Sequence, residues 1–225
     1  METFKKELLG LHNEGFRVAR TKQCTSVLGP GQRAVIWFHG CSLKCPGCIA
    51  FEMNHSAEFT PYTPRELYEW VHGLSGIEGI TLSGGDPFDQ PGLALLEFLQ
   101  LVRKDGQLSV MCYTGRTLEE LMTSPENDLN RQILDYVDIL VDGPYEQLKN
   151  EGHQWRGSSN QKIHFLTERY MHLRSEILES KNRGVEIDLS LDNRLTLTGI
   201  PEIGFIKRLR NQLESRGVDF RLEAD

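Results

Sequence analysis

The sequence predicts an α/β protein in which parallel strands alternate with helices. Apolar runs such as residues 35–38 show no polar alternation, which is typical of strands that are covered on both faces. Between such runs, apolar residues recur at helical spacing, as with Leu67, Val71 and Leu74. Strands that alternate with helices in this way favour parallel pairing through right-handed crossovers.

In chain order, a short amphipathic helix is expected at residues 3–12 and a short edge strand at 16–20. The strands of the sheet are expected at residues 35–38, 77–82, 108–113, 137–141 and 163–166. Polar and glycine-rich motifs follow directly after the ends of these strands, which is where α/β barrel enzymes place their sites.

Two helices are expected to begin at capping boxes, one at Thr63 and one at Thr117, each with a glutamate three residues further on. Pro64 suits the first position of the earlier helix. Between these two helices, a third is expected whose apolar face is formed by Leu93, Leu96, Leu99 and Val102.

The last quarter of the chain has a different pattern. The expected elements are a helix at 167–181, a half-buried strand at 185–191, a turn at 192–193, a returning strand at 194–198, a helix from Pro201 to Gly217 and a strand at 218–222. A hairpin with one short helix is marginal alone, so its apolar face is expected to pack on the rest of the protein.

Charge and composition limit the partners. The chain of 225 residues carries 25 basic and 32 acidic side chains, a net charge of −7, which argues against nucleic acid as a partner. The N-terminus lacks the apolar segment of a signal peptide, and no apolar run reaches membrane-spanning length. A cytoplasmic protein with no membrane partner is therefore expected.

Three of the five cysteines form one group. Cys41, Cys45 and Cys48 have C-x3-C-x2-C spacing after an apolar run, and an odd cysteine count does not suit a disulfide framework. Close thiolates suit zinc or an iron–sulfur cluster. On the cysteines alone, a structural zinc site completed by His39 or His55 stays open.

The other two cysteines lie apart from this group. Cys112 falls in an apolar strand pattern and is expected to be buried, whereas Cys24 is given no role.

Four further motifs accompany the cysteine loop in a fixed order. They are Gly29-Pro30-Gly31-Gln32-Arg33, Ser83-Gly84-Gly85-Asp86-Pro87, Leu140-Val141-Asp142-Gly143 and Trp155-Arg156-Gly157-Ser158-Ser159-Asn160-Gln161. Together with the cysteine spacing, they resemble the radical S-adenosylmethionine (SAM) superfamily, and within it the activating enzymes of anaerobic ribonucleotide reductase. The residue before the third cysteine is aromatic in most of that superfamily, but here it is Gly47, as in the activating subgroup.

The resemblance implies an incomplete, open (β/α) barrel over residues 1–166. Residues 167–225 lie beyond the resemblance, and their own pattern predicts a small α/β extension packed over the open side of the barrel. The resemblance further implies a [4Fe-4S] cluster held by the three grouped cysteines, with one iron left open for SAM. A flavodoxin- or ferredoxin-type reductant would supply one electron, and SAM would yield methionine and a 5′-deoxyadenosyl radical. That radical would generate a glycyl radical on the reductase.

The resemblance also assigns contacts. Gly84 and Gly85 would admit the methionine amino group beside the charge of Asp86, although spacing alone favours Asp86 as the cap of a turn. The other expected SAM contacts are Gly47, Ile49, Tyr113, Thr114 and Asp142. Contacts with substrate or partner are expected at Gly31, Arg33, Arg156 and Ser158.

Two alternatives stay open at this point. A radical SAM enzyme could act directly on a small molecule or peptide, with residues 167–225 shaping its pocket. A non-enzymatic binding module could be stabilised by zinc or by a cluster.

Overall fold

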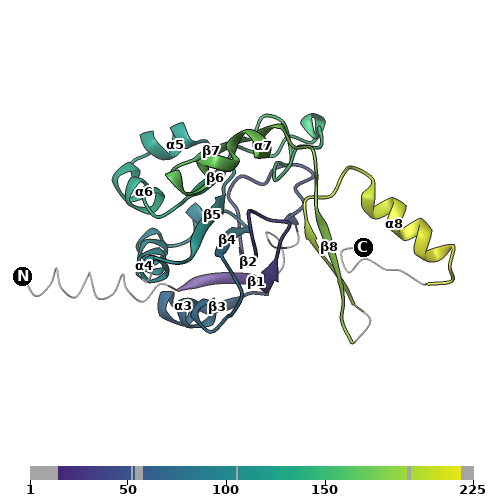
Figure 1. Ribbon diagram of the computed structural model, residues 1–225, viewed down its shortest axis with the longest axis horizontal. Coiled ribbons are helices and arrows are strands. Elements are labelled where there is room, and N and C mark those ends of the chain that lie inside the picture. Colours follow the sequence, from purple (N-terminus) through teal and green to yellow (C-terminus); the bar gives the residue numbers. More distant parts are fainter. Residues whose placement is uncertain (1–14, 52, 54–57, 105, 192–193, 219–225) are drawn as a thin grey trace, which may run out of the picture.

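A computed structural model describes residues 15–51, 53, 58–104, 106–191 and 194–218 (Figure 1). Within them, a seven-stranded sheet has the order β3-β1-β2-β4-β5-β6-β7. The strands are β1 Phe16–Thr25, β2 Arg33–Phe38, β3 Thr60–Tyr62, β4 Gly79–Gly84, β5 Ser109–Tyr113, β6 Ile139–Asp142 and β7 Lys162–Phe165. The central strands β2, β4, β5 and β6 pair in parallel, as the alternation of elements predicts.

The flanking strands differ from the expectation. β1 is longer than predicted and is not an edge strand, because the unpredicted strand β3 pairs outside it. β7 runs antiparallel to β6. A mixed α/β fold with a parallel centre results, and the incomplete barrel stays a prediction.

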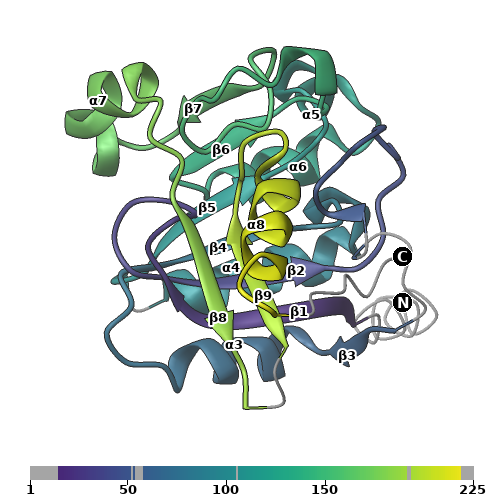
Figure 2. The same ribbon diagram turned by 90° about the vertical axis from the view of Figure 1, so that its right-hand side faces the viewer.

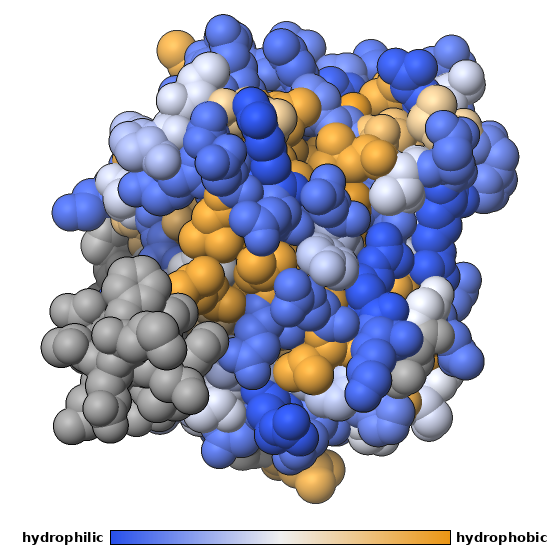
Figure 3. All heavy atoms as spheres, turned by 90° about the vertical axis from the view of Figure 1, so that its left-hand side faces the viewer, coloured by the Kyte–Doolittle hydropathy of each residue, from blue (hydrophilic) through white to orange (hydrophobic). Residues whose placement is uncertain are grey.

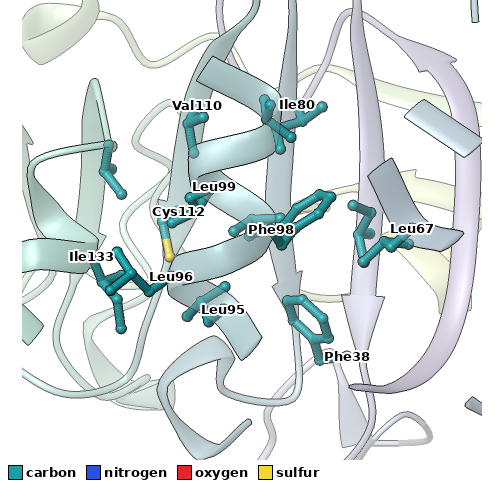
Figure 4. Packing of buried hydrophobic residues seen from close by; sticks show 14 of the residues in the cluster. Phe38, Leu67, Ile80, Leu95, Leu96, Phe98, Leu99, Val110, Cys112 and Ile133 are labelled. Atoms are coloured by element: carbon teal, nitrogen blue, oxygen red, sulfur yellow. The ribbon is translucent and has the colours of Figure 1, made fainter. Parts of the chain in front are cut away.

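Helices cover one face of this sheet (Figure 1). They are α3 Pro64–His72, α4 Gly92–Arg103, α5 Leu118–Thr123 and the unpredicted α6 Asn127–Leu134. Figure 4 shows Phe98 and Leu99 of α4 in one apolar cluster with Ile80 of β4 and with Cys112, which is buried as expected. Leu93 was expected on the same face but is 40% exposed. The outer surface over this helical layer is largely hydrophilic (Figure 3).

Both predicted capping boxes are confirmed. The hydroxyl of Thr63 accepts a hydrogen bond from the Glu66 N–H, and the Glu66 carboxylate accepts one from the Thr63 N–H. Thr117 and Glu120 make the same reciprocal pair at α5. Pro64 occupies the first turn of α3, where its missing N–H costs nothing.

The segment predicted as one helix at 167–181 forms two short elements, η3 (Glu168–Leu173) and α7 (Arg174–Glu179). Ile177 is buried against Met111 and Ile139 of the sheet, and the Tyr170 hydroxyl lies 2.8 Å from the Ser109 hydroxyl. These elements therefore pack on the sheet in a second apolar cluster, and the assignment of residues 167–225 to one added unit stays a prediction.

The hairpin of β8 (Val185–Leu189) and β9 (Leu195–Gly199) is present, but its orientation contradicts the expectation. Its charged face contacts β1, where Lys22 pairs with Glu186 and Asp188. Its apolar face is exposed, with Ile187 at 44% and Leu189 at 67%. Because Glu186 and Asp188 of β8 pair with Lys22 of β1, the charged face of the hairpin is turned toward the sheet. The apolar side chains of β8 therefore lie on the face turned away from it.

The final helix α8 (Phe205–Glu214) begins after Gly204 rather than at Pro201, and it buries no side chain. It lies on the side of the hairpin that faces away from the sheet (Figures 1 and 2). The helix expected at 3–12 and the turn at 192–193 lie outside the described residues, as does most of the strand expected at 218–222. No helix in the described part of the chain has the length and apolarity to cross a bilayer.

Arg33 was expected to contact a substrate or partner, but its side chain is fully buried, so the structure gives that expectation no support. Its guanidinium donates to the hydroxyls of Thr81 and Ser109, both at 2.8 Å, and to the carbonyl of Pro30 at 3.1 Å. Burial lowers the pKa of this guanidinium. Arg33 thus fills the interior between the amino-terminal ends of the parallel strands.

We predict that Arg33→Met lowers the free energy of unfolding by on the order of 3 kcal/mol, because the buried acceptors lose their donors. Chemical denaturation measures this change. Iron bound per folded molecule should stay the same, because Arg33 lies away from the cavity described below. A stable Arg33→Met protein with lost iron would contradict this structural role.

Candidate active site

A cavity of about 420 Å³ opens at the carboxyl ends of the parallel strands. This volume lies within the range of roughly 300–1,000 Å³ that small-molecule sites occupy. The cysteine loop after β2 and the ends of β4 and β5 supply much of its wall. The side facing the C-terminal unit is formed by residues 197–201, 203 and 204.

Cys41, Cys45 and Cys48 all line this cavity. The Cys48 N–H donates to the Cys45 carbonyl at 3.2 Å, which closes a tight turn. Gly47 lies in that turn at φ 72°, a left-handed conformation that disfavours other residues. Burial raises the pKa of the Cys48 thiol, and the neighbouring thiols of Cys45 and Cys41 raise it further.

Gly84 and Gly85 line the cavity, and the packing of the strand ends also requires them to be glycines. A Cβ on Gly84 would lie 2.6 Å from the Phe38 carbonyl, and one on Gly85 only 1.9 Å from the Gly40 carbonyl. Hydrogen bonds join the same segments, from the Gly85 N–H to Phe38 and from the Asp86 N–H to Gly40. The glycines therefore let the end of β4 lie directly against the cysteine loop.

Asp86 also lines the cavity, but its carboxylate is hydrogen-bonded to other groups of the protein. It accepts hydrogen bonds from the N–H groups of Phe88 and Gly115 at 2.9 and 3.0 Å, and from the Thr114 hydroxyl at 2.9 Å. Burial raises its pKa although these donors oppose the shift. The capping role suggested by spacing alone is present, and it ties the end of β4 to the end of β5.

Of the remaining expected SAM contacts, Ile49, Tyr113 and Thr114 line the cavity. Ile49 is 57% exposed. The Tyr113 hydroxyl is buried without a hydrogen-bond partner among the described residues. Burial strongly raises the pKa of Tyr113, so this group stays a neutral phenol that can donate a hydrogen bond to a bound molecule.

Asp142 does not line the cavity. Its carboxylate accepts from the Leu118 N–H at 2.7 Å and lies 3.0 Å from His164 Nε2. Burial opposes ionisation, but His164 and the N–H groups of Leu118 and Lys162 lower the pKa of Asp142 below its ordinary value. Asp142 therefore joins β6 to α5 and β7, and the expected contact with SAM has no geometric support.

The expected partner contacts also lie away from the cavity wall. Gly31 packs against Glu78, which precedes β4. Ser158 is fully buried and accepts a hydrogen bond from the Glu146 N–H, while Arg156 donates to the Gln161 carbonyl. Gly157 and Gln161 are the members of this motif that reach the cavity.

Sequence reasoning missed several residues of the wall. Arg20 stacks its guanidinium 4.2 Å from the centre of the Trp37 ring, and both line the cavity. Gln147 and Asn150 line it from the irregular segment around η2 (Gln147–Lys149). No motif marks these residues, and only the path of the chain brings them to the site.

Several known proteins are similar to this chain. Residues 27–164 match the protein family described as a 4Fe-4S single cluster domain. The anaerobic ribonucleoside-triphosphate reductase-activating protein of Escherichia coli (strain K12) is 34% identical over 62% of this chain and 92% of its own length. The proteins of the same name from Pasteurella multocida and Enterobacteria phage T4 are 34% and 32% identical, over 63% and 64% of this chain and 92% and 90% of theirs. Among solved structures, QueE from Escherichia coli matches 49% of this chain and 58% of its own, at 15% identity and a TM-score of 0.36.

The match over residues 27–164, which is more than half of the chain, shows that the chain belongs to the 4Fe-4S single cluster domain family, a class that the three grouped thiols fit. Within that class, the chain belongs to the family of anaerobic ribonucleoside-triphosphate reductase-activating proteins. The alignments leave more than a third of the chain outside them, because they cover 62–64% of it.

Proposed function

We propose that this chain binds a [4Fe-4S] cluster through Cys41, Cys45 and Cys48, cleaves SAM reductively and generates a glycyl radical on an anaerobic ribonucleotide reductase. One observation carries the proposal. The three thiols and the glycine-rich end of β4 border one cavity of a size suited to a small cofactor, in a chain of the activating family.

The arrangement of the thiols suits a cluster better than a single zinc ion. Four ligands around one zinc bind at about 2.3 Å and must therefore crowd together. Among the described residues, no three His, Cys, Asp or Glu side chains are close enough to hold one ion. In a cubane, each cysteine binds a different iron, so three thiols around a wider cavity fit. The ring of His39 lies 5.2 Å from that of Phe59 and does not line the cavity.

When bound, the cluster and SAM supply the chemistry: one electron from a flavodoxin- or ferredoxin-type reductant cleaves a carbon–sulfur bond, giving methionine and a 5′-deoxyadenosyl radical that takes hydrogen from the target. The protein holds and shields these groups. Gly84 and Gly85 keep the wall beside the thiols free of side chains, Asp86 fixes that wall to β5, and Ile49 provides an apolar surface for the adenine. The Tyr113 hydroxyl, which has no hydrogen-bond partner among the described residues, offers a donor.

The decisive experiment reconstitutes the protein anaerobically with iron and sulfide, then adds SAM, a reductant and the cognate reductase. We expect a brown protein and a glycyl-radical signal on the reductase in electron paramagnetic resonance (EPR) spectra. SAM cleavage without a radical on the reductase would contradict the activase assignment. A colourless protein that holds one zinc would contradict every enzymatic assignment.

A second candidate is a radical SAM enzyme that abstracts hydrogen directly from a small molecule or peptide. The wall formed by residues 197–201, 203 and 204 favours it, because this wall comes from the C-terminal unit and borders a cavity of a size that suits a small molecule. Product analysis with peptide or metabolite pools in place of the reductase separates the two. Turnover of such a compound in the absence of the reductase would support the second candidate.

A further inference from the structure

A charged network joins three loops beside the first cysteine. Asp89 ends the short helix η1 (Pro87–Asp89), and its carboxylate accepts hydrogen bonds from the N–H and hydroxyl of Ser42 at 2.6 and 3.1 Å. The same carboxylate pairs with Arg116, whose guanidinium also lies 3.3 Å from the Ser42 hydroxyl. The three residues come from the cysteine loop, the β4–α4 connection and the β5–α5 connection.

This network is next to the expected ligand without lining the cavity. Ser42 directly follows Cys41, and neither Asp89 nor Arg116 reaches the cavity wall. The side chain of Asp89 is 15% exposed and that of Arg116 35%, so solvent screens the pair only in part.

Ser42, which directly follows Cys41, connects both charges to the cysteine loop through its N–H to Asp89 and its hydroxyl to Arg116. Burial lowers the pKa of Arg116, but the hydrogen bond and charge of Asp89, with smaller contributions from Asp86 and Cys41, raise it above its ordinary value. The pair thus places one negative and one positive charge near a single cluster ligand.

We propose that Asp89 and Arg116 are positioning residues that hold the Cys41 end of the cysteine loop and balance the charge around the cluster. This inference rests on the proposed function, because it needs a cluster at Cys41. Groups that orient metal ligands typically contribute about 10- to 100-fold to metal affinity. Charges near an iron–sulfur cluster also shift its potential, because reduction adds a negative charge.

The two charges predict opposite effects. Asp89→Asn leaves the Arg116 cation without its counter-charge, so the added electron is stabilised and the midpoint potential rises. Arg116→Gln leaves the Asp89 carboxylate unneutralised, so the potential falls. The double variant removes both charges and should return close to the unmodified value. Arg116→Lys keeps the charge and should stay near it as well.

The test uses the full chain after anaerobic reconstitution, with midpoint potentials from EPR-monitored redox titration and iron release to a chelator. We expect opposite shifts in the two single variants and about tenfold faster iron release in each. Arg103→Gln is the matched control, because it breaks the partly buried pair with Asp138 on the helical side of the sheet and should leave the potential unchanged.

Shifts of the same sign in both single variants, or none, would overturn the inference even if the proteins bind less iron. If Asp89→Asn does not fold, the two Arg116 variants suffice as the test. The midpoint potential should fall in Arg116→Gln and stay near the unmodified value in Arg116→Lys. Failure of the cluster assignment is distinguishable, since the unmodified protein would then hold no cluster to titrate. Failure of the activase assignment alone would leave the potentials measurable.

Discussion

Replacement of Cys41, Cys45 or Cys48 by alanine is expected to abolish SAM cleavage in each case. Two thiolates cannot hold a cubane with one defined open iron, whereas three leave a single iron for SAM. Iron content and 5′-deoxyadenosine formation after anaerobic reconstitution measure the effect. All three thiols line one cavity, so the loss should not depend on which one is removed.

Cys24→Ala is the matched control. Cys24 is exposed and donates to Gln32 at 2.9 Å, away from the cavity wall, so its replacement should leave iron content and cleavage intact. Cys112→Ala should do the same, at some cost in stability because that thiol is buried in the main core. Full activity in a Cys45→Ala protein would show that the cluster assignment is wrong.

A chain that ends at Gly184 is expected to keep its cluster and its uncoupled SAM cleavage but to lose activity on the true target by about 100-fold, as misplacement of a reacting group typically costs. The cut removes the β8–β9 hairpin and α8, and with them the wall formed by residues 197–204. It keeps Arg183, which donates to the carbonyls of His153 and Arg156 and to the side chain of Asn150. Iron content, cleavage in the absence of target, and target turnover are the measurements.

A chain that ends at Leu166 is the informative comparison. It also loses η3 and α7, and with them the buried side chain of Ile177 and the contact of Tyr170 with Ser109. The Thr167 hydroxyl, which lies 2.6 Å from the Asp138 carboxylate, is removed as well. This shorter chain should lose its cooperative unfolding transition together with its cluster.

We therefore propose that the recognition unit begins after Gly184 and that residues 167–184 belong to the core. Loss of iron in the chain ending at Gly184 would make the hairpin part of the core fold. Unchanged target turnover would make the wall of residues 197–204 dispensable.

Local chemistry let the sequence alone predict the parallel centre and the helix starts. The run at 35–38 has no polar alternation, so it can only be covered on both faces, and the boxes at Thr63 and Thr117 satisfy the first N–H groups of their helices with their own side chains. The cysteine spacing and the glycine-rich strand end are likewise short motifs of neighbouring residues, so they can be recognised in the sequence. These features depend on neighbours within a few positions, which the sequence displays directly.

Other features depended on which distant residues meet. The alternation at 185–191 correctly indicated a two-faced strand, but it could not show that Lys22 would draw the charged face inward. The motif residues Arg33, Asp142 and Ser158 have the chemistry of contact residues, yet each is buried and bound to groups distant in the chain.

The same distinction applies to the residues of the candidate site. The sequence by itself determined that Cys41, Cys45 and Cys48 share one loop beside Gly84 and Gly85, because parallel strands bring their carboxyl ends to one edge. Only the tertiary structure decided that residues 197–204 form the facing wall and that Asp89 and Arg116 flank Cys41. Such contacts depend on how segments distant in the chain pack and pair their charges. That packing results from many small, opposing free-energy contributions, which no local sequence pattern reveals.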